Sequence, residues 1–220
     1  MDPQLQRLYP DISAAGGLAI AMSTLAHLRG LAIGPVAASL HGIRIGTDRG
    51  TVTVSLAPEE RLFLLGVHSP GFTWGTGSTG ELGLLVDAVS AWCSGMSIDE
   101  FEAKFPFVRL DEFARALEVG DVTPQQWSQL LGSDFYAAHR SLLRRIHADE
   151  RLRTLFPTFT HGELRLRVDP MDFESRQFLV DHLGEHRYQV TTVDELRTTR
   201  VTESLDDLIG CLRALLGGTD

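Results

Sequence analysis

The sequence predicts an α+β protein: an antiparallel β-meander with packed helices, a helical middle segment, a second small β region and a C-terminal helix. Apolar and polar residues alternate over residues 39–74 and again after Pro157, a period typical of half-buried strands. Between these runs, apolar residues recur at helical spacings of three and four. The 220 residues, 43% hydrophobic and 22% charged, suffice for a core without metal or disulfide support.

We expect the chain to begin with a helix from Ile12 to Leu31, because leucine and methionine recur there on one face. Short alternating segments follow, separated by clusters of turn-forming residues. Such segments are typical of an antiparallel meander. The strands are predicted over residues 39–45, 51–56, 61–67 and 72–74.

A glycine-rich segment, residues 75–80, leads from the last of these strands into a helix that ends near Cys93. Ser78 and Glu81 have the spacing of a capping box, so we expect Ser78 to cap this helix. A glycine-rich loop before a helix can bind an anion through free backbone amides. The segment lacks the Lys-Ser/Thr pair of a P-loop, and Glu81 would repel a phosphate. A tight turn followed by a capped helix is the alternative interpretation.

The second half is predicted to begin with helices and end with a small sheet and a helix. Capping signals at Ser97 and Thr123 mark two helix starts, and Ser204 with Asp207 marks the last. We expect helices over residues 97–105, 110–117, from 123, 134–155, 173–183 and 204–216, and strands over 162–168, 187–193 and 196–201. Residues 1–108 and 109–220 are the two expected regions, as separate lobes or as one compact domain.

Charge and composition exclude several classes of function. The net charge is −9, and no basic footprint for nucleic acid is present. Met1-Asp2-Pro3 is acidic where a secretory signal would be basic, and no apolar run reaches the length of a membrane span. We therefore expect a cytoplasmic protein that binds neither nucleic acid nor membrane.

Cofactor and metal motifs are absent from the sequence. Cys93 and Cys211 lie far apart and show no zinc or redox spacing. His182 and His186 are four residues apart, but Gly184 between them disfavours one helix face and there is no HExxH motif. We predict no metal and no cofactor.

Histidines and one glutamate supply the catalytic candidates, which are His68, His161 and Glu163. His161 and Glu163 flank a glycine at a strand start and can form an acid/base pair. His68 shares the first meander with His41, and the two share a face if their strands are neighbours. Each histidine has the plainer interpretation of a solvated or hydrogen-bonded side chain.

The ligand-binding candidates come mainly from the glycine-rich segment. Trp74 can wall a pocket, although a tryptophan on a short strand is more often part of the core. Hydroxyl groups suited to polar recognition follow it closely. The ligand-binding candidates are His41, Trp74, Thr76, Ser78 and Thr79.

Five short motifs in the first half carry a resemblance. They are Leu8-Tyr9-Pro10-Asp11, Phe72-Thr73-Trp74-Gly75, Thr79-Gly80-Glu81-Leu82, Ala91-Trp92-Cys93-Ser94-Gly95-Met96-Ser97 and Phe105-Pro106-Phe107. Together they resemble an actinobacterial family of natural-product-biosynthesis proteins of unknown function. The resemblance implies a setting in secondary metabolism, including peptide-derived products, and implies no catalytic residues. The chain from Arg109 onward is matched to nothing.

Two functional hypotheses follow. The first is an accessory or tailoring protein that binds a small-molecule or peptide intermediate of a secondary-metabolite pathway without a cofactor. The alternative is a non-enzymatic module of the immunity or adaptor type that binds a protein partner, for which an acidic surface suits a basic partner. A helical scaffold subunit that acts only inside a complex is a third interpretation.

Overall fold

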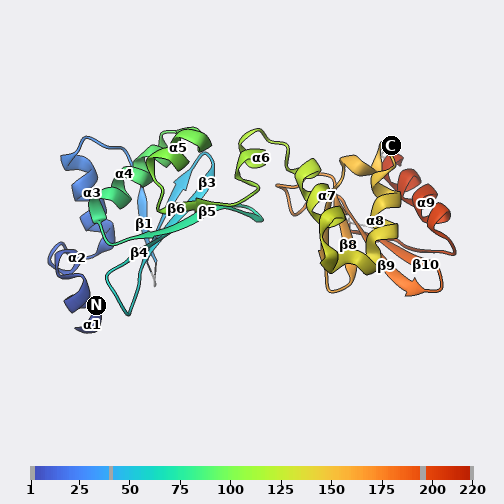
Figure 1. Ribbon diagram of the computed structural model, residues 1–220, viewed down its shortest axis with the longest axis horizontal. Coiled ribbons are helices and arrows are strands. Elements are labelled where there is room, and N and C mark those ends of the chain that lie inside the picture. Colours follow the sequence, from blue (N-terminus) through green and yellow to red (C-terminus); the bar gives the residue numbers. More distant parts are fainter. Residues whose placement is uncertain (1–2, 40–41, 194–196, 219–220) are drawn as a thin grey trace. The chain divides into compact units, whose positions relative to one another are not determined.

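The computed structural model describes residues 3–39, 42–193 and 197–218. Two compact units divide the chain, Met1–Val119 and Gly120–Asp220. In each unit the described residues form one antiparallel sheet together with helices, as Figure 1 shows. The predicted α+β class, with its meander, helical middle, second β region and C-terminal helix, is confirmed.

The first sheet is a meander in which each strand pairs with the next one along the chain. Its order is β1-β2-β3-β4-β5-β6, and every pairing is antiparallel. The strands are β1 (Val36–Ser39), β2 (Gly42–Thr47), β3 (Gly50–Leu56), β4 (Phe63–Ser69), β5 (Phe72–Thr79) and β6 (Val108–Leu110).

Helices of the first unit cover one side of this sheet, and Figure 1 shows α4 and α5 along it. They are α1 (Pro3–Leu8), α2 (Pro10–Ala14), α3 (Leu18–Leu28), α4 (Leu82–Cys93), α5 (Ile98–Lys104) and α6 (Ala114–Glu118). The expected single helix from Ile12 to Leu31 is wrong. Gly16 and Gly17 adopt φ values of 87° and 129°, which separate α2 from α3.

Aromatic side chains build the centre of this unit. Trp92 on α4 packs edge-on against Trp74 on β5, with ring centroids 5.4 Å apart, and against Phe101 on α5 at 5.2 Å. Phe101 in turn contacts Phe105 at 5.0 Å. Edge-to-face pairs of this kind add to the stabilisation from area burial. The chain therefore fixes α4 and α5 to the sheet through one continuous aromatic cluster.

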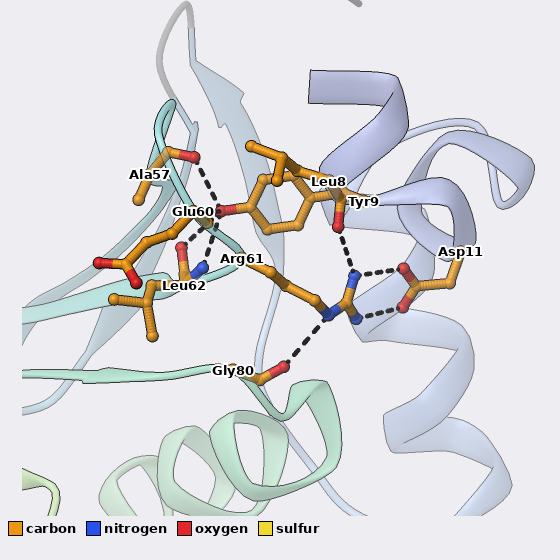
Figure 2. A network of polar contacts seen from close by, with 8 residues as sticks. All are labelled: Leu8, Tyr9, Asp11, Ala57, Glu60, Arg61, Leu62 and Gly80. Carbon is orange, nitrogen blue, oxygen red and sulfur yellow. Dashed lines mark hydrogen bonds and ion pairs between the residues drawn. The ribbon is translucent and has the colours of Figure 1, made fainter. Parts of the chain in front are cut away.

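A polar network fixes the N-terminal helices to the turn between β3 and β4, as Figure 2 shows. The hydroxyl of the fully buried Tyr9 lies 2.9 Å from the Ala57 carbonyl oxygen and 2.8 Å from that of Leu62, and it accepts the Leu62 N–H at 3.0 Å. Arg61 donates two bonds to the Asp11 carboxylate, at 2.7 and 2.8 Å. These bonds from Arg61 hold the pKa of Asp11 below its usual value.

The glycine-rich segment is strand, which corrects both interpretations of it, the anion-binding loop and the tight turn before a helix capped by Ser78. β5 runs to Thr79, and α4 begins at Leu82 with Glu81 at the N-cap position, so Ser78 does not cap it. A Cβ at Gly75 would lie 2.8 Å from the Arg109 carbonyl oxygen, and one at Gly77 would lie 2.6 Å from that of Phe107. The glycines thus allow β6 to approach β5 closely.

The second unit has a five-stranded sheet in the order β11-β10-β9-β8-β7, again entirely antiparallel. Leucine and aromatic side chains of its helices pack on Leu164, Leu166, Phe178 and Val180 of the sheet. The strands are β7 (Phe156–Thr160), β8 (Glu163–Arg167), β9 (Gln177–Gly184), β10 (Arg187–Val193) and β11 (Thr199–Thr202). The helices are α7 (Val122–Gly132), η1 (Asp134–His139), α8 (Arg140–His147), η2 (Leu152–Thr154) and α9 (Leu205–Gly217).

Three predicted helices are corrected here. The segment predicted as a helix over residues 173–183 contains β9, whose Phe178 and Val180 alternate into the core. The predicted helix over 134–155 is a 3₁₀ turn, α8 and a second 3₁₀ turn. The predicted helix over 110–117 starts later, because Leu110 still belongs to β6.

Candidate functional site

The first sheet has one face turned toward its helices and one turned away. On β3 and β4 the side chains of Val52, Val54 and Leu65 face the core, because alternate residues of a strand point to opposite sides. The residues between them therefore face away from the helices. Exposed side chains on that second face include Arg44, Thr76, Ser78 and Arg109.

Five residues form one line across this outer face. Strand register pairs Arg44 with Thr53, Thr53 with Gly66, Gly66 with Thr76, and Thr76 with Arg109. Neighbouring strands lie roughly 4.8 Å apart, so the two arginines are separated by about 19 Å at the backbone. The line has a guanidinium at each end and hydroxyl groups between them.

A depression of about 670 Å³ lies along the part of this line from Thr53 on β3 to Arg109 on β6, and we call it the trough. Arg44 lies one strand beyond Thr53 on the same face. Its lining combines hydroxyl groups with apolar side chains and one arginine, Arg109. The trough is lined by Thr53, Ser55, Leu64, Leu65, Gly66, Thr76, Gly77, Ser78, Pro106, Phe107 and Arg109.

The floor of the trough at Gly66 is set by two neighbouring side chains. A Cβ at Gly66 would lie 2.5 Å from His68 Nε2 and 2.9 Å from Thr53 Oγ1. His68 Nδ1 lies 3.3 Å from Thr73 Oγ1, and Thr53 Oγ1 donates to the Gly66 carbonyl at 3.3 Å. The His68 ring therefore lies over Gly66, with Nε2 next to the glycine and Nδ1 next to the Thr73 hydroxyl.

The side chains of the two arginines of this line, Arg109 in the trough and Arg44 beyond it, make no polar contact to a described residue that stabilises the fold. Within the described part of the chain, neither Arg44 nor Arg109 forms an ion pair or a side-chain hydrogen bond. Guanidinium groups bind carboxylates and phosphates through paired N–H donors. Hydroxyl groups such as that of Thr76 can donate or accept. The trough is thus suited to a ligand with anionic and amide groups.

The structure brings together three of the predicted site residues. His68, Thr76 and Ser78 share the outer face of β4 and β5. Trp74 and Thr79 instead face the core side: the Trp74 indole donates to the Arg49 carbonyl at 3.0 Å, and Thr79 Oγ1 accepts the Glu81 N–H at 3.2 Å.

The remaining predicted residues lie elsewhere. His161 occupies the turn between β7 and β8 of the second unit, exposed and with φ of 53°. Glu163 begins β8 and lies 3.6 Å from Arg165. His41 lies outside the described residues.

Sequence reasoning missed Arg44, Thr53, Gly66 and Arg109. The alternation in β3 and β4 carries a signal for Thr53 and Gly66, since both fall at the polar positions of their strands. Nothing local places Arg109 on the sheet, because β6 has three residues and follows two helices. Its position depends on the pairing with β5.

The residues that the structure describes contain no cluster of three or more side chains able to hold a metal ion. Burial raises the pKa of the Cys93 thiol, which disfavours the reactive thiolate. Among the described helices, none is both long and apolar enough to cross a membrane.

Comparison with models of known protein families gives no match, and comparisons with curated proteins and with solved structures give none either. The trough therefore has to be interpreted from its own chemistry.

Proposed function

We propose that this protein is an accessory protein that binds a biosynthetic intermediate, a peptide or a small molecule with a carboxylate or similar anionic group, in the trough of its first unit. The observation that carries the proposal is the line from Arg44 to Arg109, in which two unpaired guanidinium groups flank the hydroxyl groups of Thr53 and Thr76.

The length of the line from Arg44 to Arg109 suits a short extended ligand. An extended peptide rises about 3.3 Å per residue, so roughly five or six residues span the distance between the two arginines. Leu64 and Phe107 offer apolar contacts beside the hydroxyl groups. A ligand with alternating polar and apolar groups fits this lining.

The shape of the trough favours binding over catalysis. Enzyme pockets enclose most of a small ligand within mainly apolar walls. This trough is open, and His68, whose imidazole is of a type that can transfer protons, lies beside Gly66 at its edge. Covalent tailoring by His68 remains the enzymatic form of the same proposal.

The setting in secondary metabolism rests on the sequence resemblance alone. The motifs behind it lie mainly in the Tyr9 network and the Trp74–Trp92 cluster, which hold the fold together. Pro106 and Phe107 are the members of those motifs that line the trough.

Native mass spectrometry of the full chain against an extract of its own host tests the proposal. We expect a bound small molecule or peptide on the wild type, and its loss in Arg109→Met and Arg44→Met. Arg7→Met is the matched control, because Arg7 is an exposed arginine on α1 that does not line the trough. A ligand of unchanged mass after incubation supports binding, and a changed mass supports tailoring.

Two results contradict the proposal. One is the absence of any bound small molecule or peptide. The other is equal retention of the ligand by the arginine variants and the control.

A protein-binding module of the adaptor or immunity type is the second candidate function. The openness of the trough favours it, because an open polar surface can also receive a segment of a folded partner. A stoichiometric protein partner in the same spectrum, lost in Arg109→Met, supports this function in place of the first.

A further inference from the structure

Arg167, the last residue of β8, is a buried arginine in the second unit. Its side chain lies on the face of the sheet opposite Leu164 and Leu166, because it is one residue beyond the inward-facing Leu166. Only 4% of the residue is exposed. The guanidinium lies between two rings, 5.2 Å from the centroid of Phe156 and 4.6 Å from that of Phe173.

This guanidinium lacks the polar partners that burial demands. Its Nε and Nη1 atoms are buried without a hydrogen-bond partner, and Arg167 forms no ion pair within the described part of the chain. Stacking on aromatic faces compensates for part of the lost hydration of a guanidinium. It supplies no acceptor for the N–H groups, and buried charges in proteins are ordinarily paired.

A second arginine extends the positive charge. Arg165 lies two residues earlier on the same face of β8, and its own Nε is also buried without a partner. Its weak partners are Gln177 Oε1 at 3.4 Å and Glu163 Oε1 at 3.6 Å. The proximity of Arg165 adds to the burial of Arg167 in lowering the Arg167 pKa below that of an ordinary arginine.

Asp169, the nearby carboxylate of this chain, is not a hydrogen-bond or ion-pair partner of Arg167. Asp169 is close enough to act on Arg167 electrostatically, but no ion pair forms between them within the described residues. Its Oδ1 instead accepts the Met171 N–H at 2.8 Å. Asp169 therefore shapes the loop between β8 and β9.

That loop holds Phe173 over the guanidinium. The Val168 N–H donates to the Arg176 carbonyl at 3.1 Å, and the Gln177 side-chain amide donates to the Phe173 carbonyl. Phe173 itself is 48% exposed, unusual for a ring of this size. An exposed aromatic ring stacked on a buried, unpaired arginine leaves the guanidinium edge as the place for an acceptor.

We propose that Arg167 and Arg165 form a binding site for an oxyanion, the carboxylate or phosphate group of a ligand, at the side of the Phe173 ring. Nε and Nη2 form one edge of the Arg167 guanidinium, and Nη1 and Nη2 form its end; either pair of parallel N–H donors matches the two oxygens of such a group. This site is in the second unit and does not depend on the function proposed for the trough.

Arginine-selective NMR of the full wild-type chain tests this site directly. Inorganic phosphate and acetate are titrated separately, with potassium chloride keeping the ionic strength constant. We expect saturable shifts of the Arg167 and Arg165 Nε–Hε signals, assigned with Arg167→Lys and Arg165→Lys. A response to phosphate alone identifies a phosphate site, and a response to acetate alone identifies a carboxylate site.

Variants then test the role of the guanidinium. Arg167→Met should weaken binding of the effective anion roughly ten- to a hundredfold, the effect of losing one or two charge-assisted hydrogen bonds. Arg200→Met on β11 is the matched control, since Arg200 is an exposed arginine of the same sheet. If Arg167→Met does not fold, Arg167→Lys, which keeps the charge but loses the paired donors, should still weaken binding.

Two outcomes overturn the site. The first is no saturable shift of the Arg167 signal with either anion in the wild type. The second is equal anion binding by the Arg167 variants and Arg200→Met.

Discussion

The imidazole of His68 lies over Gly66, close enough that a Cβ on the glycine would be 2.5 Å from Nε2. The two residues lie two positions apart on β4 and on the same face of the sheet. The absence of a side chain at one position thus gives the other its place at the trough. This pairing makes Gly66 a structural requirement of the candidate site.

Gly66→Ala should displace His68 and destabilise the protein by about 1–3 kcal/mol, because the new methyl group overlaps both His68 and Thr53. Urea denaturation measures the change in the free energy of unfolding. Gly46→Ala on β2 is the control: nothing lies within 4 Å of a Cβ there, so we expect no loss. Equal losses of unfolding free energy in Gly66→Ala and Gly46→Ala would falsify the steric overlap of a Cβ at position 66 with His68 and Thr53.

Tyr9→Phe should cost about 1–3 kcal/mol of unfolding free energy, because it removes a buried hydroxyl that lies 2.9 Å from the Ala57 carbonyl oxygen and 2.8 Å from that of Leu62. Thermal and urea unfolding of the purified variant check this value. Tyr136→Phe is the control, since no hydrogen bond of the Tyr136 hydroxyl occurs among the described residues. A loss as large in the control would contradict the role of the network in Figure 2.

Arg49→Lys should destabilise the first unit by roughly 1–2 kcal/mol. Arg49 donates to the Met96 carbonyl at 2.8 Å and to the Gly95 carbonyl at 3.0 Å, and its guanidinium lies over the Trp92 ring at 5.2 Å. A lysine cannot make the forked contact. Arg44→Lys, whose guanidinium is exposed and unpaired, should leave the midpoint of urea unfolding unchanged. An equal decrease of the unfolding midpoint in Arg44→Lys would contradict a stabilising role for the two bonds from Arg49 to the Met96 and Gly95 carbonyls.

The stability of the second unit should fall with acid through Asp149. Burial tends to raise the Asp149 pKa, but the N–H groups of Leu152 and Arg151 and the Arg213 guanidinium together lower it below 3.8. A lowered folded pKa means that this stabilisation is complete above about pH 4–5. It is lost as pH falls below 3.8 and through the folded value.

Urea unfolding at several pH values between about 6 and 3 measures this dependence. Asp149→Asn should be less stable than the wild type near neutral pH and should lose less stability on acidification. Asp206→Asn is the control, because Asp206 also pairs with an arginine but its side chain is 82% exposed. An unchanged acid dependence in Asp149→Asn contradicts the assignment.

Local signals predicted the first meander and two of the helix caps, whereas Ser78 and Thr123 do not cap the helices that they were expected to start. The alternation in β3 matches a strand with one buried face, and Ser97 and Ser204 cap α5 and α9 through the N–H groups of Glu100 and Asp207. These features depend on residues close together in the sequence. Period and capping chemistry are therefore enough to find them.

The elements that were predicted wrongly are those whose structure depends on pairing with segments distant in the sequence. β9 was predicted as a helix, because residues 173–183 carry no clear alternation beyond Phe178 and Val180 and their pairing with β8 and β10 is not visible locally. The glycines of β5 indicate a loop by composition, yet they serve the close approach of β6. The candidate site was found only in part, since Thr76 and Ser78 are local while Arg109 arrives through long-range pairing.

The sequential order of strands in both sheets has a consequence for how the chain folds. Each strand pairs with a strand adjacent to it in sequence, so most pairings close short loops and contact order stays low for a β-rich protein. Folding can proceed hairpin by hairpin from the N-terminus. During synthesis, the residues up to Val119 can complete their sheet before β7 to β11 leave the ribosome.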